Sequence, residues 1–328
     1  MTLALAGARY TAHAAADRIE LADAVTGTSV SIAPSQGNVA FSMKVHGHEL
    51  LWYMPGQMSG VPFVGPWANR LDEQAFWANG RRYPFDMALG NVRGAIPIHG
   101  FLTLTDKWKV VDVRANQSSA WATSRLEFFR EPAWMKQWPF AHTIDMTYRL
   151  RDGVLEVETS IANLSSEPMP IAIGFHPYFQ LTDSPRDEWT IAVPAKTHWK
   201  LAPTKVPTGE TEPIEALFPD PHAIPLRDYD LDDVFGDLEH DAQGRATMTV
   251  KGKSERLDVL FGPNYRAAVV WAPKGRPFVC FEPMAGVTDA TNLAQRGLYK
   301  ELQSLAPGQT WRESFWISPG GAEAPTNR

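Results

Sequence analysis

Apolar and polar residues alternate along much of this chain. This period of two constrains the fold most, because successive side chains of a strand point to opposite sheet faces. The clearest case spans residues 144–161. Asp152-Gly153 stands at its centre, and Asp-Gly favours a tight turn because such turns need positive φ angles, which cost glycine little. The segment therefore predicts an antiparallel hairpin. Its alternating residues are Ile144, Met146, Tyr148 and Leu150 before the turn and Leu155, Val157, Thr159 and Ile161 after it.

Residues 38–45 show the same pattern, which predicts one sheet face formed by Val39, Phe41, Met43 and Val45. A helical period is almost absent, and Gly, Pro, Asn and Asp recur at short intervals. These features predict an all-β fold, a large antiparallel β-sandwich. Further strands are predicted at 108–113, 257–261, 267–271, 278–282 and 314–317.

The chain has 328 residues, of which 44% are hydrophobic, so it can bury a sizeable core. No low-complexity linker divides it, and we expect a single domain over residues 1–318. The last ten residues, PGGAEAPTNR at 319–328, are expected to form a disordered tail.

Charge and composition exclude several classes of protein. The net charge is −6 and no basic stripe is visible, which argues against a nucleic-acid partner. No apolar run is long enough for a membrane span, and the N-terminus lacks the basic region of a signal peptide, so a cytoplasmic location is expected. A single cysteine, Cys280, excludes an internal disulfide framework. Motifs for zinc, phosphate or dinucleotides are missing, so no metal and no cofactor are expected.

Two loops carry candidate binding residues. Asn69 and Arg70 follow an aromatic stretch broken by Pro and Gly, and a guanidinium there offers several donors to ligand hydroxyls or to a carboxylate. The alternative is a surface arginine after a turn. His99 and Gly100 follow a Pro-interrupted apolar run, which suits a strand end that opens on a cleft. The alternative there is a hydrogen-bonded structural histidine.

His176 and Glu282 are the candidates for proton transfer. His176 lies among Phe175, Pro177 and aromatic residues, and its ordinary pKa is already near the range of a proton donor or acceptor at neutral pH. Glu282 is expected to end a hydrophobic strand, where a carboxylate is costly unless it is paired or used. The alternatives are a core histidine bonded to a backbone carbonyl and a structural salt bridge.

Taken together and in order, these segments resemble the aldose 1-epimerase (galactose mutarotase) family, over about residues 15–318. Each piece is weak alone, but seven in family order are specific. The pieces are Gly65-Pro66 to Asn69-Arg70, Asn79-Gly80 to Tyr83, Asn91 to His99-Gly100, Trp138-Pro139-Phe140, Gly174 to Phe179, Leu231 to Phe235, and Phe281-Glu282-Pro283.

The resemblance implies a galactose mutarotase-like supersandwich that interconverts the α and β anomers of a free aldose. It implies Glu282 as general base and His176 as general acid, with no nucleotide or metal. Arg70, His99 and Asp232 would bind sugar hydroxyls, supported by Asn69 and Tyr178. The expected partner is a small-molecule sugar, and the expected assembly is a monomer or weak homodimer.

Three other functions remain open from the sequence. Phe101-Leu102 follows His99-Gly100 where the usual mutarotase has a second glycine, which is similar to the glucose-6-phosphate 1-epimerase relatives. A hexose-6-phosphate 1-epimerase would use Arg93 or another basic residue for the phosphate. A non-catalytic sugar-binding protein would stack Trp67, Trp134 or Trp138 on sugar faces. A glycoside hydrolase would pair Glu282 with a second carboxylate such as Asp232.

Overall fold

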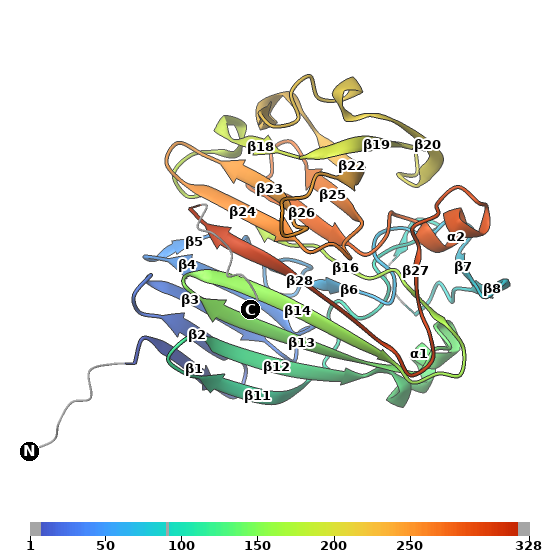
Figure 1. Ribbon diagram of the computed structural model, residues 1–328, viewed down its shortest axis with the longest axis horizontal. Coiled ribbons are helices and arrows are strands. Elements are labelled where there is room, and N and C mark those ends of the chain that lie inside the picture. The colour runs from blue at the N-terminus through green and yellow to red at the C-terminus, as the bar shows by residue number, and fades with distance from the viewer. Residues whose placement is uncertain (1–7, 90–91, 321–328) are drawn as a thin grey trace, which may run out of the picture.

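The computed structural model describes residues 8–89 and 92–320, and most of its regular structure is antiparallel β-sheet (Figure 1). One sheet comes from the N-terminal segment, and each of its strands pairs with the next along the chain. In the described residues its strands are β1 (Tyr10–Ala14), β2 (Ile19–Asp23), β3 (Thr28–Ala33), β4 (Val39–Val45) and β5 (His48–Glu49).

A longer sheet combines the middle of the chain with its end. Strand β28 lies between β14 and β24 (Figure 1). The last strand therefore joins two parts of the sheet that come from earlier segments of the chain. β28 reaches Pro319, which pairs with Leu257, so the first residue of the predicted tail belongs to a strand. Residues 321–328 of that tail lie outside the described residues. The strand order is β11 (Lys109–Ala115), β12 (Ala120–Glu127), β13 (His142–Arg151), β14 (Val154–Asn163), β28 (Thr310–Pro319), β24 (Arg256–Phe261), β23 (Ala246–Lys251), β18 (Thr190–Ala192) and β21 (Ile224–Pro225).

A further sheet positions most of the candidate functional residues. Its order is β20 (Pro207–Pro213), β19 (Ala195–Leu201), β22 (Leu231–Leu238), β25 (Ala267–Ala272), β26 (Val279–Met284), β16 (Gly174–Phe175) and β6 (Phe63–Val64), and β17 (Tyr178–Phe179) also pairs with β26. Short ribbons pair β7 (Ala75–Ala78) with β8 (Arg81–Pro84), β9 (Val92–Arg93) with β10 (Ile96–Pro97), and β15 (Met169–Ile171) with β27 (Gln303–Leu305).

Helices are short, as the lack of a helical period indicates. In the described part of the chain the α-helices are α1 (Pro132–Gln137) and α2 (Ala290–Gln295). Single 3-10 turns occur at Phe128–Arg130, Arg186–Glu188, Ile214–Ala216 and Leu226–Asp228. Within the described residues, no helix has both the length and the apolar character that a membrane crossing requires.

The hairpin predicted at residues 144–161 is confirmed as β13 and β14. Along β13 buried residues alternate with partly exposed ones, as the period of two requires. Asp152 and Gly153 both have positive φ, 49° and 77°, which is the geometry that favours Asp-Gly in two-residue turns. The five further predicted strands also occur, as β11, β24, β25, β26 and β28, with ends that differ by a few residues.

The prediction for residues 38–45 is wrong in one respect. The strand exists as β4, but Phe41 is only half-buried, whereas Ala40 and Met43 are fully buried. The pairing of β3 with β4 shifts between Ser31 and Ile32, and this bulge changes the phase of the alternation by one residue. The Phe41 ring packs instead against Tyr53, with ring centroids 5.2 Å apart.

The larger sheets share one hydrophobic core. A single cluster of contacting buried side chains includes Val30 and Met43 of the N-terminal sheet, Met146 of the β28-containing sheet, and Phe235 and Phe281 of the β26-containing sheet. Burial of apolar surface against neighbouring sheets is what stabilises such a fold. The predicted all-β antiparallel sandwich is therefore confirmed.

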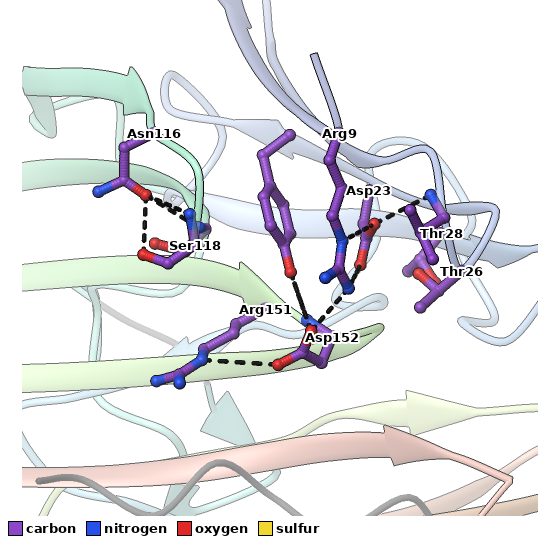
Figure 2. A network of polar contacts seen from close by, with 11 residues as sticks. Arg9, Asp23, Thr26, Thr28, Asn116, Ser118, Arg151 and Asp152 are labelled. Atoms are coloured by element: carbon purple, nitrogen blue, oxygen red, sulfur yellow. Dashed lines mark hydrogen bonds and ion pairs between the residues drawn. The ribbon is translucent and has the colours of Figure 1, made fainter. Parts of the chain in front are cut away.

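A polar network ties the β13–β14 turn to the N-terminal sheet (Figure 2). The backbone N–H of Asp152 donates to the Tyr10 hydroxyl at 3.0 Å, and that hydroxyl donates to Asp152 Oδ1 at 3.2 Å. The Arg9 guanidinium bridges the carboxylates of Asp152 (2.6 Å) and the buried Asp23 (3.0 and 3.1 Å). Because the Tyr10 hydroxyl accepts a hydrogen bond from the backbone of the turn, it fixes this end of the hairpin against β1.

We predict that Tyr10→Phe lowers the free energy of unfolding by about 1 kcal/mol, because the Asp152 N–H loses its protein acceptor in a partly buried place. Urea unfolding with an unchanged m-value measures this. Tyr53→Phe is the matched control, since its hydroxyl bonds Gln36 at an exposed site, and it should change stability by less than about 0.5 kcal/mol. Equal losses in the two variants would contradict the assigned role of Tyr10.

Candidate active site

The register of β26 brings His176 to Glu282. β16 pairs with β26 at Gly174 and Met284, and β17 pairs with it at Tyr178 and Cys280. The same antiparallel register places His176 opposite Glu282, midway between these two pairs. The prediction that Glu282 ends a strand is wrong: β26 continues through Pro283 to Met284, so the carboxylate lies within the strand.

Two loops lie against this sheet and carry three of the other candidates. The backbone of Gly65 forms a bridge with Gly100, and Arg70 forms one with Ile98. The His99 N–H donates to the Asn69 carbonyl at 2.8 Å. Gly100 has a φ of +57°, and a Cβ there would lie 2.0 Å from the Gly65 carbonyl oxygen, so the close approach requires glycine. These contacts place Asn69, Arg70 and His99 side by side.

Arg70 is held from both sides by acceptors. Its guanidinium donates to Asn69 Oδ1 at 3.0 Å and to Asp232 Oδ2 at 3.0 Å, and the residue is 7% exposed. Asp232 reaches it from β22, where it pairs with Trp271 of β25. A guanidinium has five N–H donors, so a clamped Arg70 keeps a fixed orientation and retains donors for a ligand.

The hydrogen bonds of His99 determine its tautomer. The backbone N–H of Asn69 donates to His99 Nδ1 at 3.2 Å, so Nδ1 is an unprotonated acceptor. Burial lowers the pKa of His99 well below its ordinary value, and the nearby His176 and Arg70 lower it further. A neutral imidazole with an unprotonated Nδ1 carries its proton on Nε2. His99 is therefore a neutral hydrogen-bond donor at this site.

His176 and Glu282 form a buried pair. His176 Nε2 lies 3.1 Å from Glu282 Oε1, and the side chains are 6% and 1% exposed. Burial raises the pKa of Glu282 well above its usual range, an effect that Asp232 increases and that Arg70 and Arg93 oppose. Burial also lowers the pKa of His176 to about 3. Both shifts favour the neutral forms of the two side chains. The hydrogen bond between Oε1 and Nε2 therefore holds one shared proton over a wide pH range.

This pair has the properties of an acid–base catalyst. The single proton can lie on either partner of the 3.1 Å hydrogen bond, so one group donates while its neighbour accepts. The second carboxylate oxygen, Glu282 Oε2, is buried and has no hydrogen-bond partner among the described residues. A buried acceptor without a partner is costly, and a ligand hydroxyl at that oxygen would remove the cost.

The structure brings six of the seven predicted site residues into one pocket and places Tyr178 behind it. The Tyr178 ring stacks on the His176 imidazole, with centroids 4.8 Å apart, so its observed contact orients the imidazole. Sequence reasoning missed Trp271 as a site residue, although its place at the end of a predicted strand, residues 267–271, was a usable signal. The pocket is lined by Asn69, Arg70, Arg93, Ile98, His99, His176, Asp232, Trp271 and Glu282.

Two of the three tryptophans considered for sugar stacking are too deeply buried to stack on a sugar. Trp67 and Trp138 are each 1% exposed and pack against each other and against core aromatic residues, so no ligand reaches their faces. Trp134 is partly exposed and lines a cleft of about 600 Å³. Arg93, Ile98 and His99 line both this cleft and the pocket, so the two spaces adjoin.

Asp289 holds the loop that carries Arg70 in place through hydrogen bonds. Its backbone N–H donates to the Arg70 carbonyl at 3.1 Å, and its carboxylate accepts the Asp72 N–H at 2.9 Å and Arg296 at 2.8 Å. Asp289 is 1% exposed and has a positive φ of 62°. A buried residue with these backbone contacts fixes the path of the loop from Arg70 to Asp72.

Across residues 8–89 and 92–320, no group of three or more His, Cys, Asp or Glu side chains is arranged to hold a metal ion. The polar side chains of the pocket are instead paired with each other, as Arg70 with Asp232 and His176 with Glu282. The arrangement therefore suits proton transfer and hydroxyl recognition by side chains.

Comparison with known proteins identifies the family. The profile of the family described as aldose 1-epimerase matches residues 17–318. A galactose mutarotase-like protein from Clostridium acetobutylicum superimposes with a TM-score of 0.83 at 20% identity, over 94% of this chain and 98% of that one. Galactose 1-epimerase from Lactobacillus acidophilus gives 0.74 at 14% identity, over 94% and 97%. An aldose epimerase homologue from C. elegans gives 0.70 at 18% identity, over 90% and 96%.

We predict that Gly100→Ala destabilises the protein by at least about 2 kcal/mol more than Gly80→Ala. Both glycines have positive φ, +57° and +71°. Both variants therefore place an alanine in the left-handed region of the backbone, which costs about 1–2 kcal/mol. Only Gly100 has a backbone atom in the way of a Cβ; at Gly80 nothing lies within 4 Å. Urea unfolding of both variants measures the difference, and equal losses would show that the Gly65–Gly100 approach is not rigid.

Proposed function

The chain belongs to the aldose 1-epimerase family, and we propose that it interconverts the α and β anomers of a free aldose. Glu282 and His176 are the acid–base pair in this proposal. The observation that carries it is the 3.1 Å contact between two buried, oppositely shifted titratable groups at the floor of a polar pocket.

Anomer interconversion needs two proton transfers at neighbouring atoms. The base removes the proton of the C1 hydroxyl while the acid protonates the ring oxygen O5, so the C1–O5 bond breaks and a C1 carbonyl forms. Rotation about C1–C2 presents the other carbonyl face, and the reverse transfers close the ring. O1 and O5 are both bonded to C1, so an acid and a base that lie side by side reach both atoms. No proton is gained or lost overall.

Glu282 is the base and His176 the acid in the opening step. This step requires the carboxylate and the imidazolium, and the hydrogen bond between them supplies this form by moving one proton from Oε1 to Nε2. Arg70 and Arg93 favour the carboxylate of this form, because their charges oppose the effect of burial on the pKa of Glu282, whereas the same charges lower the pKa of His176. Ring opening then returns the pair to the neutral form that burial favours, which is the form that the closing step uses.

The remaining pocket residues bind the sugar in this proposal. Arg70 and the Nε2–H of His99 donate to ring hydroxyls, and Asp232 accepts from one. Asn69 and Tyr178 act as supporting contacts, with Tyr178 also orienting the imidazole by stacking. The enzyme would work in the cytoplasm as a monomer or weak homodimer.

A hexose-6-phosphate 1-epimerase is the second candidate, and the position of Arg93 beside the pocket favours it. Glycoside hydrolysis fits less well, because Asp232 is paired with Arg70 and the nearest partner of Glu282 is His176. A non-catalytic sugar-binding protein would not need that buried pair. Polarimetry of freshly dissolved α-anomers distinguishes these functions: the proposal requires faster mutarotation of a free aldose than the spontaneous rate. No acceleration with any free aldose would overturn it.

We predict that Glu282→Gln lowers kcat for mutarotation by at least about 10²-fold, because the amide cannot accept the proton. Glu158→Gln on β14 is the matched control and should retain activity, since Glu158 lies in another sheet and contacts Arg312. Polarimetric initial rates with circular dichroism of each variant separate catalysis from unfolding. Near-normal turnover of Glu282→Gln would remove Glu282 as the base.

The pH profile follows from the two opposite pKa shifts. Because the pKa of His176 is lowered to about 3, the pair takes up a second proton only far below pH 6.5. Because the pKa of Glu282 is raised, the pair keeps its one proton well above the ordinary carboxyl range. We therefore predict that kcat/KM stays flat from about pH 5 through pH 6.5, without the change near pH 6.5 that an ordinary histidine would cause. Buffered polarimetric rates, corrected for the spontaneous reaction, test this.

A further inference from the structure

His198 lies on the opposite face of the sheet from the pocket. It belongs to β19 and pairs with Phe235 of β22, two residues after Asp233, so these three side chains share one sheet face. Asp232 is next to Asp233, and its side chain therefore points to the other face, where it lines the pocket with Trp271. His198 does not reach a sugar bound there, so any effect that it has on binding passes through β22.

Both ring nitrogens of His198 contact a carboxylate. Nδ1 lies 3.0 Å from Glu212 Oε1 of β20, and Nε2 lies 3.1 Å from Asp233 Oδ1, while the residue is 8% exposed. A neutral imidazole has one N–H and would turn a lone pair toward one of the carboxylates, whereas the imidazolium donates at both nitrogens. Burial lowers the pKa of His198, but the hydrogen bonds to Asp233 and Glu212 outweigh it and raise this pKa above its ordinary value. The contacts therefore fit the protonated ring.

Asp233 passes this constraint on to Asp232. Its second oxygen, Oδ2, accepts the backbone N–H of Asp232 at 3.1 Å, beyond the last residue pair of β19 with β22. The Asp232 carbonyl accepts from Lys205 Nζ at 3.4 Å. Side chains thus hold the backbone of Asp232 at a point where the pairing with β19 has ended. The Asp232 carboxylate in turn accepts from Arg70 at 3.0 Å.

The charges that face His198 come from both neighbouring strands, as Glu212 of β20 and Asp233 of β22. A neutral ring keeps at most one of these two hydrogen bonds, and that bond is no longer assisted by charge. Loss of the proton therefore weakens the hold on Asp233. The other charged side chains on β19, on its neighbouring strands near His198 and on the adjoining 3-10 turn at residues 214–216 are exposed: Lys196, Lys200, Glu210, Glu215 and Asp237.

Building on the proposed function, we propose that protonated His198 is a positioning residue for sugar binding. It fixes Asp233, Asp233 fixes the backbone of Asp232, and Asp232 holds Arg70 and accepts a sugar hydroxyl. Sugar affinity then depends on the proton of His198. The chemistry at C1 does not, because Glu282 lies on β26 and its partner His176 lies between β16 and β17. Since the raised pKa keeps His198 protonated through about pH 6.5, affinity falls only as the pH rises further.

The first test follows KM and kcat separately against pH. Polarimetric rates with freshly dissolved α-glucose and α-galactose, corrected for the spontaneous reaction, start near pH 5 and extend above the pKa that NMR of the imidazole nitrogens gives for His198. We expect KM to rise about 3- to 10-fold across that pKa, the range for one weakened hydrogen bond. A constant KM across it would overturn the proposal, and so would a His198 ring that is neutral at about pH 6.5.

Two variants separate the charge of His198 from its shape. His198→Gln keeps a donor without a charge, and should raise KM about 3- to 10-fold at about pH 6 and remove its pH dependence. His198→Arg supplies a cation that does not titrate, and should keep KM low at high pH. His222→Gln is the matched control, because His222 also lies 4.0 Å from a carboxylate, that of Glu239, but is exposed. It should behave like the wild type.

Circular dichroism and urea unfolding of each variant detect a general loss of structure. A fall in kcat of His198→Gln as large as the rise in KM would assign His198 a structural role only and overturn the proposal. Failure of His198→Arg to keep KM low would also overturn it. If a variant does not fold, the KM profile of the wild type decides.

Failure of this proposal is distinct from failure of the proposed function. If no aldose is accelerated, the proposed function fails, and calorimetric titration with glucose and galactose decides on His198 alone. Weaker binding above the pKa of His198, absent in His198→Arg, would support the positioning role. Binding that does not change with pH, or no binding of either sugar, would overturn it.

Discussion

The interaction on which the site depends is the hydrogen bond between His176 and Glu282, formed between two almost fully buried side chains. A carboxylate and an imidazole buried separately would each be costly, but as a pair they share one proton, and Oε1 of the one is the hydrogen-bond partner of Nε2 of the other. The ladder of β26 makes this pairing unavoidable. The chain pairs with β26 before His176 and again after it, so the imidazole has one place to lie, opposite Glu282.

The residues around the pair provide charge and hydrogen-bond donors in fixed positions. Arg70 adds positive charge near Glu282 and is itself balanced by Asp232 and Asn69, so the pocket gains a donor without an unpaired buried cation. His99 is fixed as a neutral donor by a backbone N–H of the neighbouring loop. The loops hold these residues through backbone contacts at Gly65, Gly100 and Asp289, which do not themselves reach the pocket. Backbone contacts thus help to position the groups that are proposed to bind the sugar.

The acid–base pair and the neighbouring cleft belong to different parts of the fold. The residues proposed to move protons lie on the sheet, whereas the cleft beside them is lined by loop residues such as Leu104 and by Trp134 of α1. Loops tolerate substitution because they carry little of the core. The fold itself is shared with the structures compared above at only 14–20% identity.

The sequence by itself determined the strands and the identity of most site residues, because alternation and turn residues are local properties and because the motifs stand in family order. It named Arg70, His99, His176 and Glu282 as candidates, and the structure brings these four residues into one pocket. It could not show the bulge that turns Phe41 outward, the continuation of β26 through Pro283, or the entry of Trp271, because each depends on which strand lies alongside. Tertiary structure alone decided the protonation of the buried pair and the size of the neighbouring cleft. Burial and distance are properties of the assembled sheets, and no local pattern of residues encodes them.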